Sequence, residues 1–172
     1  MIKYPYLPKG KKINYVDASN KYMNAAKKVR DTESTDLAFS TGAVIVKNNK
    51  IIGQAGNKAG YTLPFMIKLH ANGLCFRRML KIKSGQKYWL CPGCATNKKH
   101  AENMAIKDAI TKGNQDKLPG ADLYLYGHWW CCEPCWNAMI NAGIKNVYLL
   151  KKSEVLFNLE NPDNIIRKKK TN

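Results

Sequence analysis

Two pairs of cysteines with C-x-x-C spacing constrain this chain more than any other feature of its sequence. Cys91 and Cys94 form the first pair, and Cys132 and Cys135 form the second. The first residues, MIKYPYLPKGKK, lack the hydrophobic centre of a signal peptide, so we expect a cytoplasmic protein with reduced thiols. In that setting, paired C-x-x-C motifs with histidines nearby indicate zinc first.

The hydrophobic pattern predicts a single α/β domain over residues 1–172. Helices are expected over 16–31, 99–113 and 132–143, a β-hairpin over 41–57 with its turn at Asn48-Asn49, and strands over 121–127 and 144–150. Asp17 is a candidate cap for the first helix. Because helices alternate with strands, we expect one sheet with helices on both faces, followed by a frayed basic tail over about 165–172.

Residues 58–98 fit this alternation poorly. They contain apolar residues without a clear period, and they are too long for an ordinary connection. We therefore predict an insertion held together by a structural zinc ion. The expected ligands are His70, Cys75, Cys91 and Cys94. His128 and Cys131 are alternatives to His70 as the fourth ligand.

Metal-binding residues also stand at the starts of two predicted helices. His100 lies at the entrance of the helix over 99–113, while Cys132 and Cys135 open the helix over 132–143. A helix N-terminus stabilises negative charge and therefore favours thiolates. One imidazole and two thiolates leave a zinc ion with an open position for water, which is the arrangement of catalytic sites.

Glu102 lies on the apolar face of the helix predicted over 99–113. Ile106, Ala109 and Ile110 follow it at helical spacing. A carboxylate on a core-facing stripe is costly to bury unless it has a partner or a chemical role. Beside a zinc site, a carboxylate that does not bind the metal can transfer protons. We therefore predict Glu102 as the catalytic acid and base.

The sequence HAE at 100–102, followed by C-x-x-C at a helix start, resembles the zinc-dependent cytidine and deoxycytidylate deaminase family. The segments TGAVIVKNNKIIGQAGN and CWNAMINAGIKNVYLL are similar to its first hairpin and to its last core helix and strand. The resemblance implies a three-layer α/β/α sandwich with a mixed sheet of about five strands. It also implies that His100, Cys132 and Cys135 hold a catalytic zinc ion, and that the insertion holds a second one.

The same resemblance suggests residues that contact the substrate. Asn57 is expected to bind the sugar and Ala101 to contribute a further contact. Trp130 is expected either to wall the base pocket or to pack in the core or at a subunit interface. The sequence departs from the family pattern at Cys131, where the family has proline; Pro134 lies between the two cysteines instead. Cys131 is therefore a rival ligand to the cysteine that follows it.

The predicted function is hydrolytic deamination of a cytosine nucleotide, dCMP to dUMP plus ammonia. An alternative is deamination of cytosine or adenine within single-stranded DNA or tRNA. The formal charge of +17 favours a polyanion, but only four of the 29 basic residues are arginine, which argues against base reading. A non-catalytic nucleic-acid-binding module would have no use for Glu102. We expect a homo-oligomer and no membrane partner.

Overall fold

The computed structural model describes residues 5–61, 63–82 and 86–168. Its centre is one mixed sheet of five strands in the order β1-β5-β4-β2-β3. The strands are β1 (Ile13–Val16), β2 (Gly42–Lys47), β3 (Lys50–Gly56), β4 (Asp122–Tyr126) and β5 (Asn146–Leu150). β2 is antiparallel to β3 and β4, whereas β5 is parallel to β1 and β4. The predicted mixed sheet is confirmed.

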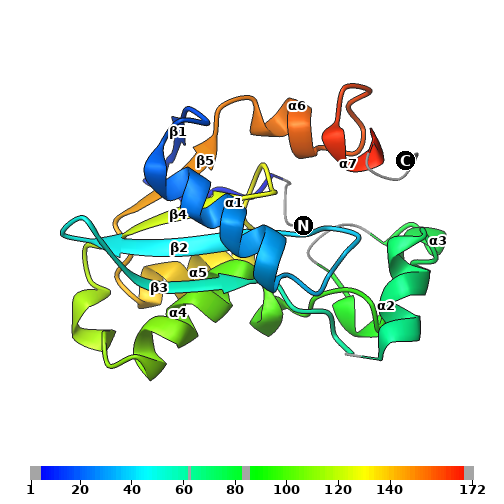
Figure 1. Cartoon of the computed structure of the whole chain (residues 1–172), viewed down its shortest axis with the longest axis horizontal. Helices are drawn as coiled ribbons and strands as arrows, with labels where there is room; N and C mark the ends of the chain where they lie inside the picture. The colour runs from blue at the N-terminus through cyan, green and yellow to red at the C-terminus, as the bar shows by residue number, and fades with distance from the viewer. Residues whose placement is uncertain (1–4, 62, 83–85, 169–172) are drawn as a thin grey trace.

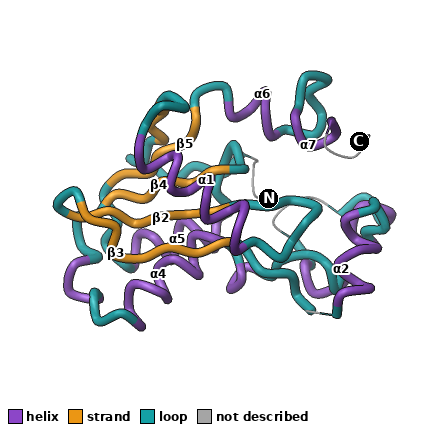
Figure 2. Tube along the Cα trace, in the orientation of Figure 1, coloured by secondary structure: helices purple, strands orange, loops and turns teal. Residues whose placement is uncertain are grey.

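Helices cover both faces of this sheet, which confirms the predicted sandwich. The described helices are α1 (Lys21–Glu33), α2 (Pro64–Ala71), α3 (Phe76–Met79), α4 (Ala101–Thr111), α5 (Glu133–Asn141), α6 (Ser153–Phe157) and α7 (Ile165–Lys168). α1 packs on one face, and α4 and α5 pack on the other (Figure 1). Figure 2 shows the same layers, with the strands running between α1 and the pair of α4 and α5.

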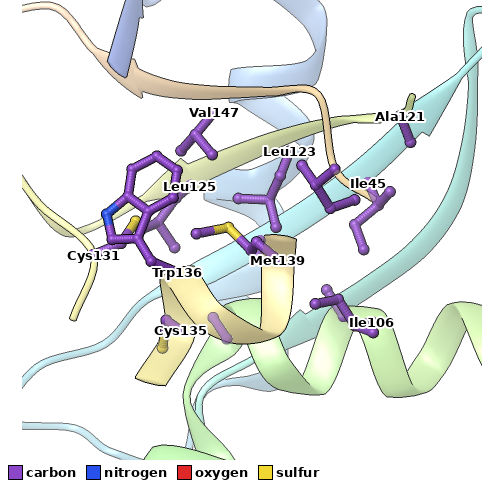
Figure 3. Close-up of a cluster of buried hydrophobic side chains, with 14 of the residues drawn as sticks. Ile45, Ile106, Ala121, Leu123, Leu125, Cys131, Cys135, Trp136, Met139 and Val147 are labelled. Carbon is purple, nitrogen blue, oxygen red and sulfur yellow. The ribbon is translucent and has the colours of Figure 1, made fainter. Parts of the chain in front are cut away.

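Side chains alternate between the two faces along each central strand, as the pleat of a β-strand requires. Val44 of β2 packs in the same cluster as Met23 of α1. The next residue, Ile45, lies in the other cluster, with Leu123 of β4 and Met139 of α5. Figure 3 shows these three side chains gathered between the sheet and α5. Two apolar cores therefore fix the helices to the sheet.

The hairpin turn was predicted correctly, but the cap of the first helix was not. Asn48 and Asn49 both have positive φ, 49° and 61°, as a tight hairpin turn requires. The cap of α1 is Asn20, whose side-chain oxygen accepts from the backbone N–H groups of residues 22 and 23. Asp17 instead forms an exposed ion pair with Lys151 at 2.8 Å. The prediction failed because the residues before Asp17 belong to β1.

The apolar face of α4 also differs from the expected stripe. Ile110 is 45% exposed, whereas Ala105 is fully buried. Glu102 shares the buried face with Ala105, Ile106 and Ala109. The buried stripe therefore turns away from Ile110 in the last turn of the helix, as a period of 3.6 residues allows.

The insertion over 58–98 lies at one end of the sheet, beyond the start of β2 and the end of β3 (Figure 1). It contains α2, α3, and two short 3-10 helices, η1 (Tyr88–Leu90) and η2 (Asn97–Lys99). Its two ends run side by side, because Gly60 N–H donates to the Cys94 carbonyl and Tyr61 N–H donates to the Pro92 carbonyl, each at 2.9 Å.

The C-terminal segment is more ordered than the sequence pattern predicts. α6 and α7 follow β5, and Phe157 is buried against the sheet. The tail predicted to be frayed over about 165–172 is helical at Ile165–Lys168, and residues 169–172 lie outside the described residues. Among the described helices, none has the length and apolar character needed to cross a bilayer.

Candidate metal centres and active-site cavity

Two helix N-termini meet at the first candidate metal centre. His100 is the residue before α4, and its backbone angles are extended. Cys132 is the corresponding residue before α5, and Cys135 lies in the first turn of that helix. α4 and α5 pack side by side on one face of the sheet, which brings the three residues together. Figure 3 shows Cys135 at the start of α5, beneath Trp136.

The donor atoms of these residues are close enough to share one ion. His100 Nδ1 lies 3.3 Å from Cys135 Sγ and 3.5 Å from Cys132 Sγ, and the two sulfur atoms are 3.2 Å apart. All three donors lie within 4.8 Å of one another. An imidazole and two thiolates are ligands that zinc prefers, and three protein ligands leave a coordination position for solvent. The donor set therefore fits a catalytic zinc ion.

The surroundings favour the thiolate form of Cys132, whereas the hydrogen bond with Cys132 and burial raise the pKa of Cys135. Hydrogen bonding with Cys135 lowers the pKa of Cys132 to about 5, in spite of its burial. Burial disfavours the charged form of His100, but its hydrogen bond with Cys132 and the nearby Glu102 carboxylate outweigh burial and raise its pKa. Asn103 donates to the Cys135 sulfur at 3.6 Å. These contacts orient the donors before any metal arrives.

Glu102 opens onto the same cavity as this cluster. The cavity has a volume of about 820 Å³, and His100, Glu102 and Cys132 all line it. Glu102 is only 5% exposed, and burial raises its pKa. A carboxyl group whose pKa lies closer to neutral pH can both accept and release a proton, as a general acid and base must.

Cys131 occupies a different position from either group of candidate ligands. Its side chain is fully buried and hydrogen-bonds with Glu102. Burial raises the pKa of this thiol well above its usual value, so it remains a thiol. The structure therefore places Cys131 as a neighbour of the buried carboxylate, whereas Cys132 lies beside His100.

The insertion contains the second candidate metal centre. The structure brings together the four residues that the sequence singled out: His70, Cys75, Cys91 and Cys94. All four are buried, and their donor atoms lie within 4.8 Å of one another. Cys94 Sγ lies 3.4 Å from His70 Nε2 and 3.7 Å from Cys75 Sγ. A closed set of four soft donors fits a structural zinc ion.

Asp36 supports this second centre, although no motif in the sequence marked it. Its Oδ1 lies 3.5 Å from His70 Nδ1, opposite the nitrogen that faces Cys94. Burial opposes protonation of His70, but its hydrogen bonds with Asp36 and Cys75 and the nearby negative charges together outweigh burial and raise the pKa to about 9. The other oxygen of Asp36 accepts from the Ala95 backbone at 3.2 Å. Asp36 therefore links the loop after α1 to the insertion.

Arg77 and Tyr88 connect the two centres. The Arg77 guanidinium donates to Cys94 Sγ across 3.7 Å and lies over the Tyr88 ring, 4.0 Å from its centroid. Tyr88 in turn meets His100 edge-on, with ring centroids 5.0 Å apart. Sequence periodicity could not reveal these contacts, because they join residues of an insertion without a regular pattern.

Gly93 permits the close approach of the C-x-x-C turn to His70. A Cβ atom at this position would lie 2.2 Å from the His70 Cβ and 2.3 Å from its Cγ, too close for any side chain. We expect Gly93→Ala to displace the imidazole and lower bound zinc from about two ions per chain to about one. Elemental analysis of the purified variant measures this. Pro92→Ala is the control, and full zinc content in the glycine variant would exclude His70 as a ligand.

The residues predicted to contact substrate lie in different environments. Asn57 and Trp130 line the cavity, and both are buried. Asn57 is largely occupied by the protein: its Oδ1 accepts from Thr41 N–H and Ser34 Oγ, and its Nδ2 donates to the Phe39 carbonyl at 2.9 Å. Nδ2 carries a second hydrogen, for which the described residues show no acceptor.

Two further residues that the sequence singled out are Ala101, as a substrate contact, and His128, as an alternative metal ligand. Ala101 is the first residue of α4 and its side chain is fully buried, so its predicted substrate contact stays a prediction. His128 lines the cavity and lies outside the second metal centre. Burial lowers its pKa to about 4. Its Nδ1 accepts from the backbone N–H groups of residues 129 and 130, so Nε2 carries the proton of the neutral ring.

Solved structures of deaminases share parts of this architecture. A diaminohydroxyphosphoribosylaminopyrimidine deaminase/reductase from Thermotoga maritima is 23% identical with a TM-score of 0.43, covering 74% of this chain and 28% of that one. The dCMP deaminase of cyanophage S-TIM5 is 21% identical with a TM-score of 0.40, covering 77% and 82%. The guanine deaminase of Bacillus subtilis is 19% identical with a TM-score of 0.40, covering 74% and 60%. Likeness at these TM-scores does not indicate the substrate of this chain.

The sequence match is more specific than the structural likeness. The chain spans less than a third of the length of the Thermotoga maritima protein, and it matches no curated protein. Residues 17–151, however, match the cytidine and deoxycytidylate deaminase zinc-binding region, and they include both candidate metal centres and Glu102. The chain therefore belongs to the cytidine and deoxycytidylate deaminase family.

Proposed function

We propose that the protein deaminates a cytosine nucleotide by hydrolysis, converting dCMP to dUMP and ammonia. The observation that carries this proposal is the shared cavity of about 820 Å³, onto which Glu102 opens beside His100 and Cys132. This arrangement combines a buried proton-transfer group with a three-ligand metal site. Together they supply what a hydrolytic deaminase needs, a nucleophile and a proton shuttle.

The roles of the residues follow from their positions. His100, Cys132 and Cys135 would hold a zinc ion, which would lower the pKa of water so that hydroxide is available near neutral pH. Glu102 accepts the proton of the attacking water and delivers it to the ring nitrogen next to C4. The same carboxyl then assists the departure of the amine as ammonia. The thiol of Cys131, hydrogen-bonded to Glu102, helps to hold that carboxyl in place.

The base and sugar have candidate partners on the cavity wall. Trp130 packs edge-on to His128, with ring centroids 5.4 Å apart, and both line the cavity. They offer an aromatic surface and one imidazole N–H to a planar base. Asn57 offers its second amide hydrogen to the sugar. We propose these three as the residues that position the substrate.

A second candidate function is deamination of cytosine or adenine within single-stranded DNA or tRNA. Its support is the net charge of +17 and the presence of Trp129 and Trp130 on the cavity, since aromatic rings stack on bases. Against it, the many lysines attract phosphates without reading bases.

An ammonia-release screen distinguishes these functions. Purified protein is incubated with dCMP, CMP, deoxycytidine, dAMP, and oligonucleotides that contain cytosine or adenine. We expect turnover of dCMP above all others. Turnover of an oligonucleotide alone would replace the first proposal with the second, and inactivity on every compound would reject both.

We also propose that each chain carries two zinc ions, one catalytic and one structural, and that the protein forms a homo-oligomer. Exposed apolar side chains on the insertion support the second point, because such surfaces commonly mark protein interfaces. They are Leu63, Phe65, Leu74, Phe76, Met79, Leu80 and Trp89.

A further inference from the structure

Two neighbouring arginines supply the positive charge on the wall of the active-site cavity. The chain has 25 lysines and four arginines, yet the cations that line the cavity in the described part of the chain are two arginines, Arg77 and Arg78. They are consecutive in α3, within the insertion. An arginine presents a planar fork of donors that matches phosphate oxygens, whereas lysine presents a point charge. The cavity therefore carries phosphate-recognition chemistry that the lysine-rich surface does not supply.

Arg77 is committed to holding the insertion together. It is 7% exposed, its Nε donates to the Gln86 carbonyl at 2.8 Å, and its guanidinium contacts both Cys94 and Tyr88. These contacts tie α3 to the second metal centre. Arg77 therefore fixes the backbone from which its neighbour, Arg78, extends.

Arg78 is placed differently. Its side chain is exposed, and its guanidinium stacks on the Phe39 ring at 4.3 Å from the ring centroid. Stacking occupies the face of the guanidinium and leaves the N–H groups on its edge to reach a ligand. It also restricts a long side chain before binding, which reduces the entropy lost when a ligand is bound.

Phe39 connects this arginine to the predicted sugar site. The Phe39 carbonyl accepts the hydrogen bond from Asn57 Nδ2 at 2.9 Å, and both residues line the cavity together with Arg78. Contacts thus link Asn57 to Phe39 and Phe39 to Arg78, on the wall of the cavity that Glu102 and His100 also line. A nucleotide needs partners for three parts, its base, its sugar and its phosphate.

We infer that Arg78, stacked on Phe39, recognises the terminal phosphate of a nucleoside monophosphate bound in this cavity, and so makes the insertion a determinant of substrate specificity. The part of this inference that concerns the reaction catalysed rests on the proposed function. A terminal phosphate is close to a dianion at neutral pH and accepts two parallel N–H bonds from a guanidinium. Glu160 of the C-terminal segment is the exposed acid among the described residues that line the same cavity.

Comparing dCMP with deoxycytidine isolates the contribution of the phosphate group to binding and turnover. Steady-state kinetics are measured for the wild type, Arg78→Ala, Arg78→Lys and Lys68→Ala. Lys68 is the matched control, because it is an exposed cation of the same insertion that does not line the cavity. Binding of both compounds is measured by calorimetry in the Glu102→Gln background, where turnover is slow. An oligonucleotide with an internal deoxycytidine, whose phosphates are diesters, forms a third arm.

We expect Arg78→Ala to raise the KM and Kd for dCMP by about 10- to 100-fold, the effect of losing hydrogen bonds to a charged group. Values for deoxycytidine should stay within about twofold, because that ligand lacks the phosphate. Arg78→Lys should be intermediate, since it keeps the charge but not the fork. Lys68→Ala should match the wild type with both ligands.

The inference would be overturned by equal losses for dCMP and deoxycytidine, by no loss for dCMP, or by a loss confined to the oligonucleotide. Equal losses would mean that Arg78 serves only the structure of the insertion. The proposed function fails separately. If the wild type deaminates none of these compounds but still binds dCMP through Arg78, the reaction is wrong and the phosphate site stands. If the wild type binds dCMP no more tightly than deoxycytidine, the phosphate site is wrong.

Discussion

Glu102→Gln is expected to slow deamination by about 10²- to 10⁴-fold while zinc content stays at the wild-type level. Glutamine has nearly the shape of glutamate and fills the same buried position at the start of α4. It cannot take up and release a proton as a carboxyl does, so water would attack without a shuttle. Turnover of dCMP and elemental analysis on the same preparation provide the two measurements.

Glu133→Gln is the matched control for this experiment. Glu133 is also a glutamate in the first turn of a helix, directly beside Cys132, but it does not line the cavity. Its removal should alter activity by less than about threefold, the scale of a charge at a helix start. Wild-type activity in the Glu102 variant, with zinc bound, would show that another group transfers the proton.

Cys94→Ser is expected to remove the second zinc ion and loosen the insertion. Cys94 contacts His70, Cys75 and Arg77, so its loss breaks the centre at its most connected ligand. Zinc should fall from about two ions per chain to about one, and the thermal midpoint should fall on the order of 10 °C, because metal binding contributes directly to folding. Elemental analysis, thermal unfolding and limited proteolysis of residues 58–98 measure these effects.

Cys132→Ser should give the complementary pattern. It removes a ligand of the first centre, so activity should be lost while the insertion resists proteolysis as in the wild type. Cys94→Ser should also reduce activity, because Cys75, Cys94 and Tyr88 form part of the cavity wall. If Cys94→Ser kept both zinc ions, the second centre would need a different set of ligands.

The sequence determined the family and most of the core elements of the fold. Two short apolar runs, 44–46 and 51–52, marked the central hairpin, Asn48-Asn49 marked its turn, and Gly143 marked the end of α5. These signals are local, because turn residues and hydrophobic periods depend on backbone conformation over a few positions. The edge strand β1 was missed, since four residues paired with β5 across the chain carry no periodic signal of their own.

The sequence also singled out the residues that form the two candidate metal centres, because soft donors at fixed spacing are rare without such a role. Tertiary structure alone decided how those donors are arranged and supported. It placed Cys131 against Glu102, set Asp36 behind His70, and stacked Arg78 on Phe39. Such contacts join residues on separate elements, and their geometry depends on how the helices and the insertion pack against the sheet. No spacing along the chain can specify that packing.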